Sequence, residues 1–363
     1  MKKFRIYVYI VFISLVFLLI FHYSIWTQIT KHVLLVHDNI YTGDLGRISM
    51  YAKSSFPRQS YPSRESVTLE KEHINFQSWY KKKNKVDILT IGDSFSNAAT
   101  QGTNPFYQDY IATFNNSKVL NINQLSGTVN YLETILVLNN NGLLDEINPT
   151  TIIIESVERF SINRFVLDIN KSVFKSYDKT VNEFNKLTNP YLAKDENINF
   201  INNQNFKALK FNILYNFDDN AFSSNAYKLR LNDNFFTSED QNSLLFFNGD
   251  LESIPKSTVE NIKKLNDNFN KLAELLHKKG IKLYFMPAVD KYNLYSKYIN
   301  KNSYPKSNFF ELLRLLPKKY QFIDTKKILR KELDKGVKDL YYSDDTHWSH
   351  KASEVIFKKV KFE

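Results

Sequence analysis

The chain has 363 residues, of which 43% are apolar and 24% charged, enough for one large domain or two small ones with a sizeable core. It contains no cysteine, which excludes disulfides, thiolate catalysis and cysteine-ligated metals. The formal net charge of +11 comes mainly from dispersed lysines. Such lysines indicate a solvated surface or attraction to an acidic polymer or anionic membrane, and no nucleic-acid partner is expected.

The N-terminus has the composition of a membrane anchor. Residues 6–26 carry no charge, and about 20 such residues span a bilayer. No small-residue cleavage site follows, which favours an uncleaved anchor over a signal peptide. The basic residues Lys2, Lys3 and Arg5 are expected to stay in the cytoplasm. We therefore predict a single-pass anchor over 1–27 in the inner or plasma membrane, with the remainder on the periplasmic or extracellular side.

Residues 28–85 lack a long periodic run and are interpreted as a stalk and lead-in, with a short amphipathic helix over 75–80. From residue 86 onward, strands and helices alternate. The strands are predicted over 86–91, 118–123, 151–155, 281–286 (ended by Pro287) and 320–324, and the helices over 103–114, 129–138, 258–279, 308–316 and 350–360.

The run at 151–155 is apolar and β-branched throughout, which is typical of a parallel strand buried on both faces. The alternation predicts an α/β fold with a mostly parallel sheet over 86–363. Periodicity weakens over 161–255, which is interpreted as an inserted subdomain.

A serine follows the first predicted strand. Gly92-Asp93-Ser94 comes directly after that strand, and ligands bind at the carboxyl ends of parallel strands. The alternative is that Ser94 caps a helix. Ser96 stands where the second glycine of Gly-x-Ser-x-Gly would be, which argues against an α/β-hydrolase elbow.

A histidine with acidic neighbours lies near the other end of the chain, in Asp344-Asp345-Thr346-His347-Trp348. A carboxylate beside an imidazole fixes its tautomer and stabilises the imidazolium that forms during proton transfer. The alternative is an exposed acidic loop. Together with Ser94, the string supplies a nucleophile, its base and the group that orients the base, which indicates acyl transfer.

These strings resemble the SGNH (GDSL-like) hydrolase superfamily over roughly 86–160 and 281–363. Gly92-Asp93-Ser94-Phe95-Ser96, Asp345-Thr346-His347-Trp348 and the strand-ending Glu155-Ser156-Val157-Glu158-Arg159 resemble the membrane-anchored branch with the alginate O-acetyltransferases of the AlgJ/AlgX type. The resemblance implies a three-layer sandwich.

The resemblance also implies roles for individual residues. Ser94 would be the nucleophile, His347 the general base and Asp345 its orienting acid, with Asp344 as the fallback. The backbone amides of Ser94 and Gly127 would form the oxyanion hole. The third-block asparagine of the superfamily is missing, so the third oxyanion donor is unassigned.

The activity implied is an extracytoplasmic O-acetyltransferase that acts on a surface or cell-wall polysaccharide, with an integral-membrane acyltransferase as its partner. The alternatives are an esterase with the same catalytic parts and a catalytically inactive glycan-binding scaffold. Lys291, Tyr295 and Trp348 are candidate substrate contacts. Glu155 and Glu158 are interpreted as structural ion pairs with Arg159. No cofactor is expected, and no metal site, because the histidines lack ligand spacing.

Overall fold

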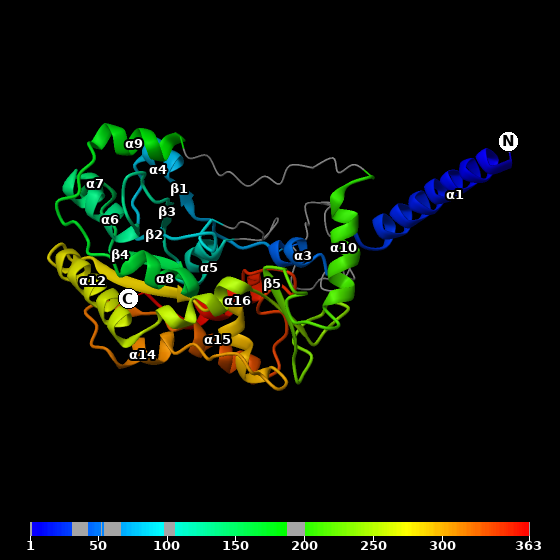
Figure 1. Ribbon diagram of the computed structural model, residues 1–363. Coiled ribbons are helices and arrows are strands. Elements are labelled where there is room, and N and C mark those ends of the chain that lie inside the picture. The colour runs from blue at the N-terminus through cyan, green and yellow to red at the C-terminus, as the bar shows by residue number, and fades with distance from the viewer. Residues whose placement is uncertain are drawn as a thin grey trace.

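The computed structural model describes residues 2–30, 43–51, 53, 67–97, 106–186 and 200–362. Six parallel strands form its central sheet, in the order β1-β3-β2-β4-β7-β8 (Figure 1). The strands are β1 (Ile74–Asn75), β2 (Ile88–Ile91), β3 (Val119–Ile122), β4 (Thr151–Val157), β7 (Lys282–Ala288) and β8 (Gln321–Phe322). The prediction of an α/β fold with a mostly parallel sheet is confirmed.

Helices cover both faces of the sheet. One layer contains α5 (Tyr107–Phe114), α15 (Thr325–Leu333) and α16 (His350–Lys359), and the other contains α6 (Tyr131–Asn140), α8 (Glu158–Phe165), α12 (Val259–His277) and α14 (Phe309–Leu315). Successive strand residues point to opposite faces. Accordingly, Phe285 packs on Phe269 of α12 at 4.2 Å between ring centroids, and Tyr284 packs on Phe362, beyond α16, at 5.0 Å.

The sheet explains why β4 is uniformly apolar. All seven of its residues are buried, between β2 and β7 in the plane and between helices above and below. Ile154 is in register with Ile91 of β2 and with Phe285 of β7, so the carboxyl ends of the central strands lie at one edge. That edge is where Ser94 was predicted to lie.

The observed elements differ from the predicted ones at several points. Strand β7 continues through Pro287 to Ala288. The proline is tolerated because β8 pairs only with Tyr284 and Phe285, so no hydrogen bond from the nitrogen of residue 287 to β8 is needed. Helix α15 was not predicted. The helix expected over 103–114 begins at Tyr107, and the part before 106 lies outside the described residues.

The segment expected to be an insertion is only partly separate from the main body. Phe165 of α8 is fully buried against Phe269 and Phe285, so α8 belongs to the main core, and α9 (Tyr177–Lys186) packs on α4 (Phe76–Lys82). A smaller unit follows, with α10 (Asn203–Leu214) and the hairpin of β5 (Ala226–Arg230) and β6 (Ser243–Phe247).

This unit has its own small core, which includes Leu45 of α3 (Asp44–Ser49). The remaining helices are α7 (Leu143–Ile147), α11 (Asn248–Glu252), α13 (Lys291–Tyr295) and the 3₁₀ turns η5 (Ile254–Lys256) and η6 (Ser296–Tyr298).

The N-terminal helix α1 (Lys2–Ile25) continues into a π-helical turn, η1 (Trp26–Thr30), and projects away from the body (Figure 1). Residues 3–30 form one helical stretch that is apolar and long enough to cross a membrane. None of the residues in its most apolar segment is buried within the structure. At about 1.5 Å per residue it exceeds the ~30 Å hydrocarbon core.

Part of the predicted stalk belongs to the main α/β body. Strand β1 pairs with β3, and Trp79 of α4 is buried. Helix α4 confirms the short amphipathic helix predicted there.

Candidate active site

Ser94 lies on a tight turn directly after β2. The amides of Ser96 and Asn97 both donate to the carbonyl of Asp93, at 3.0 and 3.1 Å, which closes the turn around Ser94. A Cβ on Gly92 would overlap the side chains of Ser96 and Glu155, so only glycine fits where the strand leaves the sheet. The turn therefore holds Ser94 at the carboxyl edge, half-buried and within reach of solvent.

Asp93 fixes this turn to the end of β4. Its carboxylate accepts hydrogen bonds from the amides of Val157 (2.8 Å) and Phe95 (3.2 Å) and forms an ion pair with Arg164. Burial alone would raise the pKa of Asp93, but the Arg164 charge and these hydrogen bonds outweigh it, and the pKa is lowered. Asp93 is thus an ionised anchor beside the candidate nucleophile.

The structure brings Ser94, His347 and Asp345 together. Ser94 Oγ lies 2.6 Å from Nε2 of His347, and Nδ1 of His347 lies 2.6 Å from Oδ1 of Asp345. The same Asp345 oxygen also accepts the backbone amide of His347 at 2.9 Å. A serine bonded to one imidazole nitrogen and a carboxylate bonded to the other is the arrangement that lets imidazole remove the hydroxyl proton.

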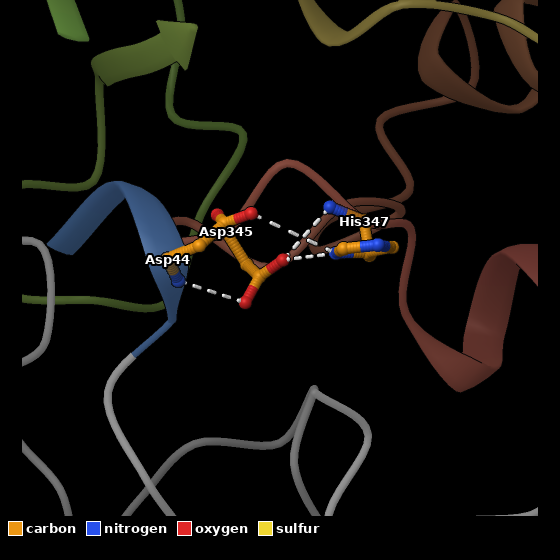
Figure 2. A group of neighbouring side chains, drawn as sticks. All are labelled: Asp44, Asp345 and His347. Carbon is orange, nitrogen blue, oxygen red and sulfur yellow. Dashed lines mark hydrogen bonds and ion pairs between the residues drawn. The ribbon is translucent and has the colours of Figure 1, made fainter. Parts of the chain in front are cut away.

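A fourth residue, Asp44 of α3, completes this cluster and was not predicted (Figure 2). Its carboxylate accepts from the amide of Thr346 (2.8 Å) and the Thr346 hydroxyl (2.6 Å), and its own amide donates to Oδ2 of Asp345 (3.1 Å). Oδ2 of Asp44 lies 3.9 Å from Nδ1 of His347. Two carboxylates therefore face the same imidazole nitrogen.

The charges around His347 favour its protonated form. Burial by itself lowers the pKa of His347, but the negative charges of Asp345 and Asp44 exceed that effect, and the pKa is raised above its usual 6.5. A raised pKa means that the imidazole takes up the serine proton more readily. It also means that the base is lost to protonation at a higher pH.

Lys291 holds the loop that carries Asp345 through hydrogen bonds to its carbonyls. Its buried ammonium donates to the carbonyls of Tyr342 (2.7 Å), Ser343 (2.9 Å) and Asp345 (3.1 Å). Burial lowers its pKa to about 8, although the charges of Asp344 and Asp345 oppose the shift. Asp344, the fallback orienting acid, accepts instead from the amide of Gly43 at 3.0 Å.

The other predicted substrate contacts are also buried. Tyr295 packs in the core on Phe236 and Tyr341, and Trp348 packs edge-on against Phe95 at 4.9 Å. As placed, none of Lys291, Tyr295 and Trp348 presents its side chain to solvent. Their contact with a substrate stays a prediction, and in the structure these three side chains pack inside the protein.

Gly127 lies in the turn after β3, exposed and with a φ of +80° that suits glycine. Because β3 is the parallel neighbour of β2, its carboxyl end meets the same edge as Ser94. Its role in an oxyanion hole stays a prediction.

The expectation that Glu155 and Glu158 form ion pairs with Arg159 is wrong. Arg159 pairs with Asp250 (3.3 Å) and Asp290 (2.9 Å). Glu155 accepts from the Ser96 hydroxyl (2.8 Å) and the Asp93 amide (3.0 Å), so it supports the turn that carries Ser94. The motif places both acids at a strand end but does not indicate their partners.

Asp44, Asp345 and His347 also offer three ligand atoms within 4.8 Å of one another. However, Nδ1 of His347 lies 2.6 Å from Asp345 Oδ1, which is a direct hydrogen bond. Metal ligands about 2.0–2.2 Å from an ion lie farther apart than this in tetrahedral geometry. The cluster is therefore better described as a histidine held by two acids than as a metal centre.

No family model and no curated protein matches this chain. The contacts of Ser94, His347 and Asp345 are therefore the observations from which a function can be inferred.

Proposed function

We propose that this protein is a membrane-anchored serine O-acyltransferase that moves an acetyl group to a hydroxyl of a surface or cell-wall polysaccharide on the extracytoplasmic side. The observation that carries the proposal is the contact of Ser94 Oγ with His347 Nε2, backed by the contact of His347 Nδ1 with Asp345. The anchor and the resemblance to membrane-bound acetyltransferases support the cellular side and the acceptor class. An integral-membrane acyltransferase would supply the acetyl group.

In the first half-reaction, Ser94 Oγ attacks the carbonyl carbon of the acetyl donor while its proton passes to Nε2 of His347. The tetrahedral intermediate then collapses, the bond to the leaving group breaks, and His347 returns the proton to that group. Asp345 stabilises the imidazolium throughout through its hydrogen bond to Nδ1. The product is an acetyl ester on Ser94.

In the second half-reaction, a sugar hydroxyl takes the place of the leaving group. His347 removes its proton, the sugar oxygen attacks the acetyl carbon, and Ser94 recovers its proton as the ester bond breaks. Water in place of the sugar would give an esterase, so transfer and hydrolysis differ only in the acceptor.

The oxyanion of both intermediates is stabilised by hydrogen-bond donors, which can be backbone amides. Within the described ranges, the amide of Ser94 donates to no other group, which leaves it available for this purpose. We assign the second donor to the amide of Gly127, in the neighbouring loop.

The test uses the full chain in lipid nanodiscs with an activated acetyl ester and candidate oligosaccharides, and reads the products by mass spectrometry. Ser94→Ala is the inactive variant, and Ser172→Ala, at an exposed serine away from the site, is the matched control. The proposal predicts an acetylated oligosaccharide that requires Ser94. Free acetate that requires Ser94, with no acetylated sugar, would instead identify an esterase. No product that requires Ser94 would favour a glycan-binding scaffold.

A further inference from the structure

An exposed apolar stripe lies on helix α10 and the turn after it. It is made of Phe206, Ile213 and Phe217, which are 65%, 48% and 75% exposed. Phe206 and Ile213 are seven residues apart in the helix, so they project from one face, and Phe217 lies in the turn that follows the last helical residue, Leu214. An amphipathic helix at the surface of a soluble domain normally turns its polar face outward. Helix α10 instead exposes Phe206 and Ile213 as well as its lysines, which indicates that its outer face meets an apolar medium.

The opposite face of α10 is already used within the protein. Ala208 is buried against Ile25 and Met50, and Tyr215, just after the helix, is buried with Ala221 and Ala226. The stripe is therefore not a core face left uncovered by a shift of the helix. Helix α10 therefore has two apolar faces, one packed against the rest of the protein and one exposed.

Helix α10 lies against the end of the candidate membrane-spanning helix. Asn205 Nδ2 lies 3.1 Å from Nδ1 of His22, and the ring of Phe200 lies 6.3 Å from that of Trp26. Figure 1 shows α10 running across the end of α1, between α1 and the catalytic body. If α1 spans a bilayer, this end is at the lipid–water boundary, where interfacial helices lie.

The charges beside the stripe suit the same position. Lys207 and Lys210 are exposed next to it, and the Lys210 ammonium donates to the hydroxyl of Ser223 at 3.2 Å. Basic side chains that flank an apolar face are typical of helices that lie in the headgroup layer and are attracted to anionic lipids. By contrast, the exposed apolar residue Leu315 belongs to α14, which lies far from α1 on the other side of the body (Figure 1).

We propose that the α10 stripe inserts into the leaflet beside the point where α1 emerges, and that it holds the catalytic body against the membrane surface. The ligand is the bilayer itself, at a depth of about 5–10 Å below the headgroup boundary. The proposal depends on α1 as a membrane span and is independent of the chemistry at Ser94.

The absence of cysteine makes a direct test possible. Single variants Phe206→Cys and Ile213→Cys of the full chain would be labelled with a bimane fluorophore and placed in nanodiscs of phosphatidylcholine and phosphatidylglycerol. Leu315→Cys is the matched control, because Leu315 is an exposed apolar residue at the end of α14, a helix on the far side of the body from α1 (Figure 1). Quenching by brominated lipids reports contact with acyl chains, and quenching by iodide reports contact with water.

We expect brominated lipid to quench the labels at 206 and 213 but not the label at 315, and iodide to do the opposite. Labels at 206 and 213 that behave like the label at 315 would overturn the proposal. Labels shielded from both quenchers would also overturn it, because a protein surface, such as a second copy of the chain, would then cover the stripe.

Discussion

Replacement of Asp345 by asparagine removes the charge that stabilises the His347 imidazolium while keeping the size of the side chain. At the observed 2.6 Å and an effective dielectric constant of about 20, this charge pair is worth about 6 kcal/mol. Asparagine also has one acceptor oxygen where Asp345 uses two, one toward His347 and one toward the amide of Asp44. The NH₂ group of asparagine must therefore face a hydrogen-bond donor, either at His347 or at the amide of Asp44.

We expect Asp345→Asn to lower kcat/KM by about 10³–10⁴-fold, since each tenfold change corresponds to about 1.4 kcal/mol and the asparagine dipole keeps part of the stabilisation. The assay is hydrolysis of a chromogenic acetyl ester by the full chain in nanodiscs, with Ser94→Ala as the background. Asp344→Asn is the matched control and should cost less than about tenfold, because Asp344 binds the amide of Gly43 rather than the imidazole. A small effect of Asp345→Asn together with a large effect of Asp344→Asn would refute the assignment of the orienting acid.

Three further predictions follow from the neighbouring groups. The acidic limb of the pH profile of kcat/KM should have its midpoint above 6.5, because the proposed base His347 must be neutral to act and its pKa is raised. Asp44→Asn should move that midpoint down, because it removes one of the charges that raise the pKa of His347. An unchanged midpoint would count against the electrostatic role of Asp44. Lys291→Met should lower the free energy of unfolding by about 2–4 kcal/mol in chemical denaturation, because three carbonyls lose a buried donor, whereas a wild-type midpoint would contradict this. Burial raises the pKa of Glu155 well above its usual range, so this side chain is a neutral hydrogen-bond acceptor. The neutral Glu155→Gln should therefore keep near-normal activity and melting temperature, while Glu155→Ala should lose about 1–3 kcal/mol of stability. Equal effects of the two variants would be inconsistent with a neutral acceptor.

The sequence predicted those parts of the site that depend on local pattern. A buried strand that ends in Gly92 places Ser94 at the carboxyl edge of a parallel sheet, and a short acidic string places a carboxylate beside His347. Strand β4 was recognised because its residues are apolar throughout. These features follow from neighbours in sequence, which is why they could be predicted without a structure.

Asp44 could not be predicted from the sequence, because its role depends on a contact made across the whole chain. It belongs to a helix of six residues in a segment without periodicity, and it binds residues about 300 positions away. The one neighbouring residue that reflects this contact is Gly43, where a Cβ would overlap the backbone of Asp344. The segment was interpreted as a stalk, but the structure makes it one wall of the candidate active site.

Lys291 and Tyr295 show a second limit of sequence reasoning. Their position after β7 correctly places them near the carboxyl edge of the sheet, but strand position does not determine which way a side chain points. The ammonium of Lys291 finds three carbonyls in the loop that ends at Asp345, and it is therefore buried rather than exposed. Helix α15 was missed because its surface is rich in lysine and its only buried apolar residues are Leu329 and Leu333.

The most direct test of the central claim is to identify the residue that carries the acyl group. The full chain in nanodiscs would be mixed with an activated acetyl ester, quenched in acid within the first turnover, digested and analysed by tandem mass spectrometry. We expect one acetyl group on Ser94, absent from Ser94→Ala and strongly reduced in His347→Ala. Acetylation of another residue at the same rate, or none on Ser94 while ester is consumed, would contradict it.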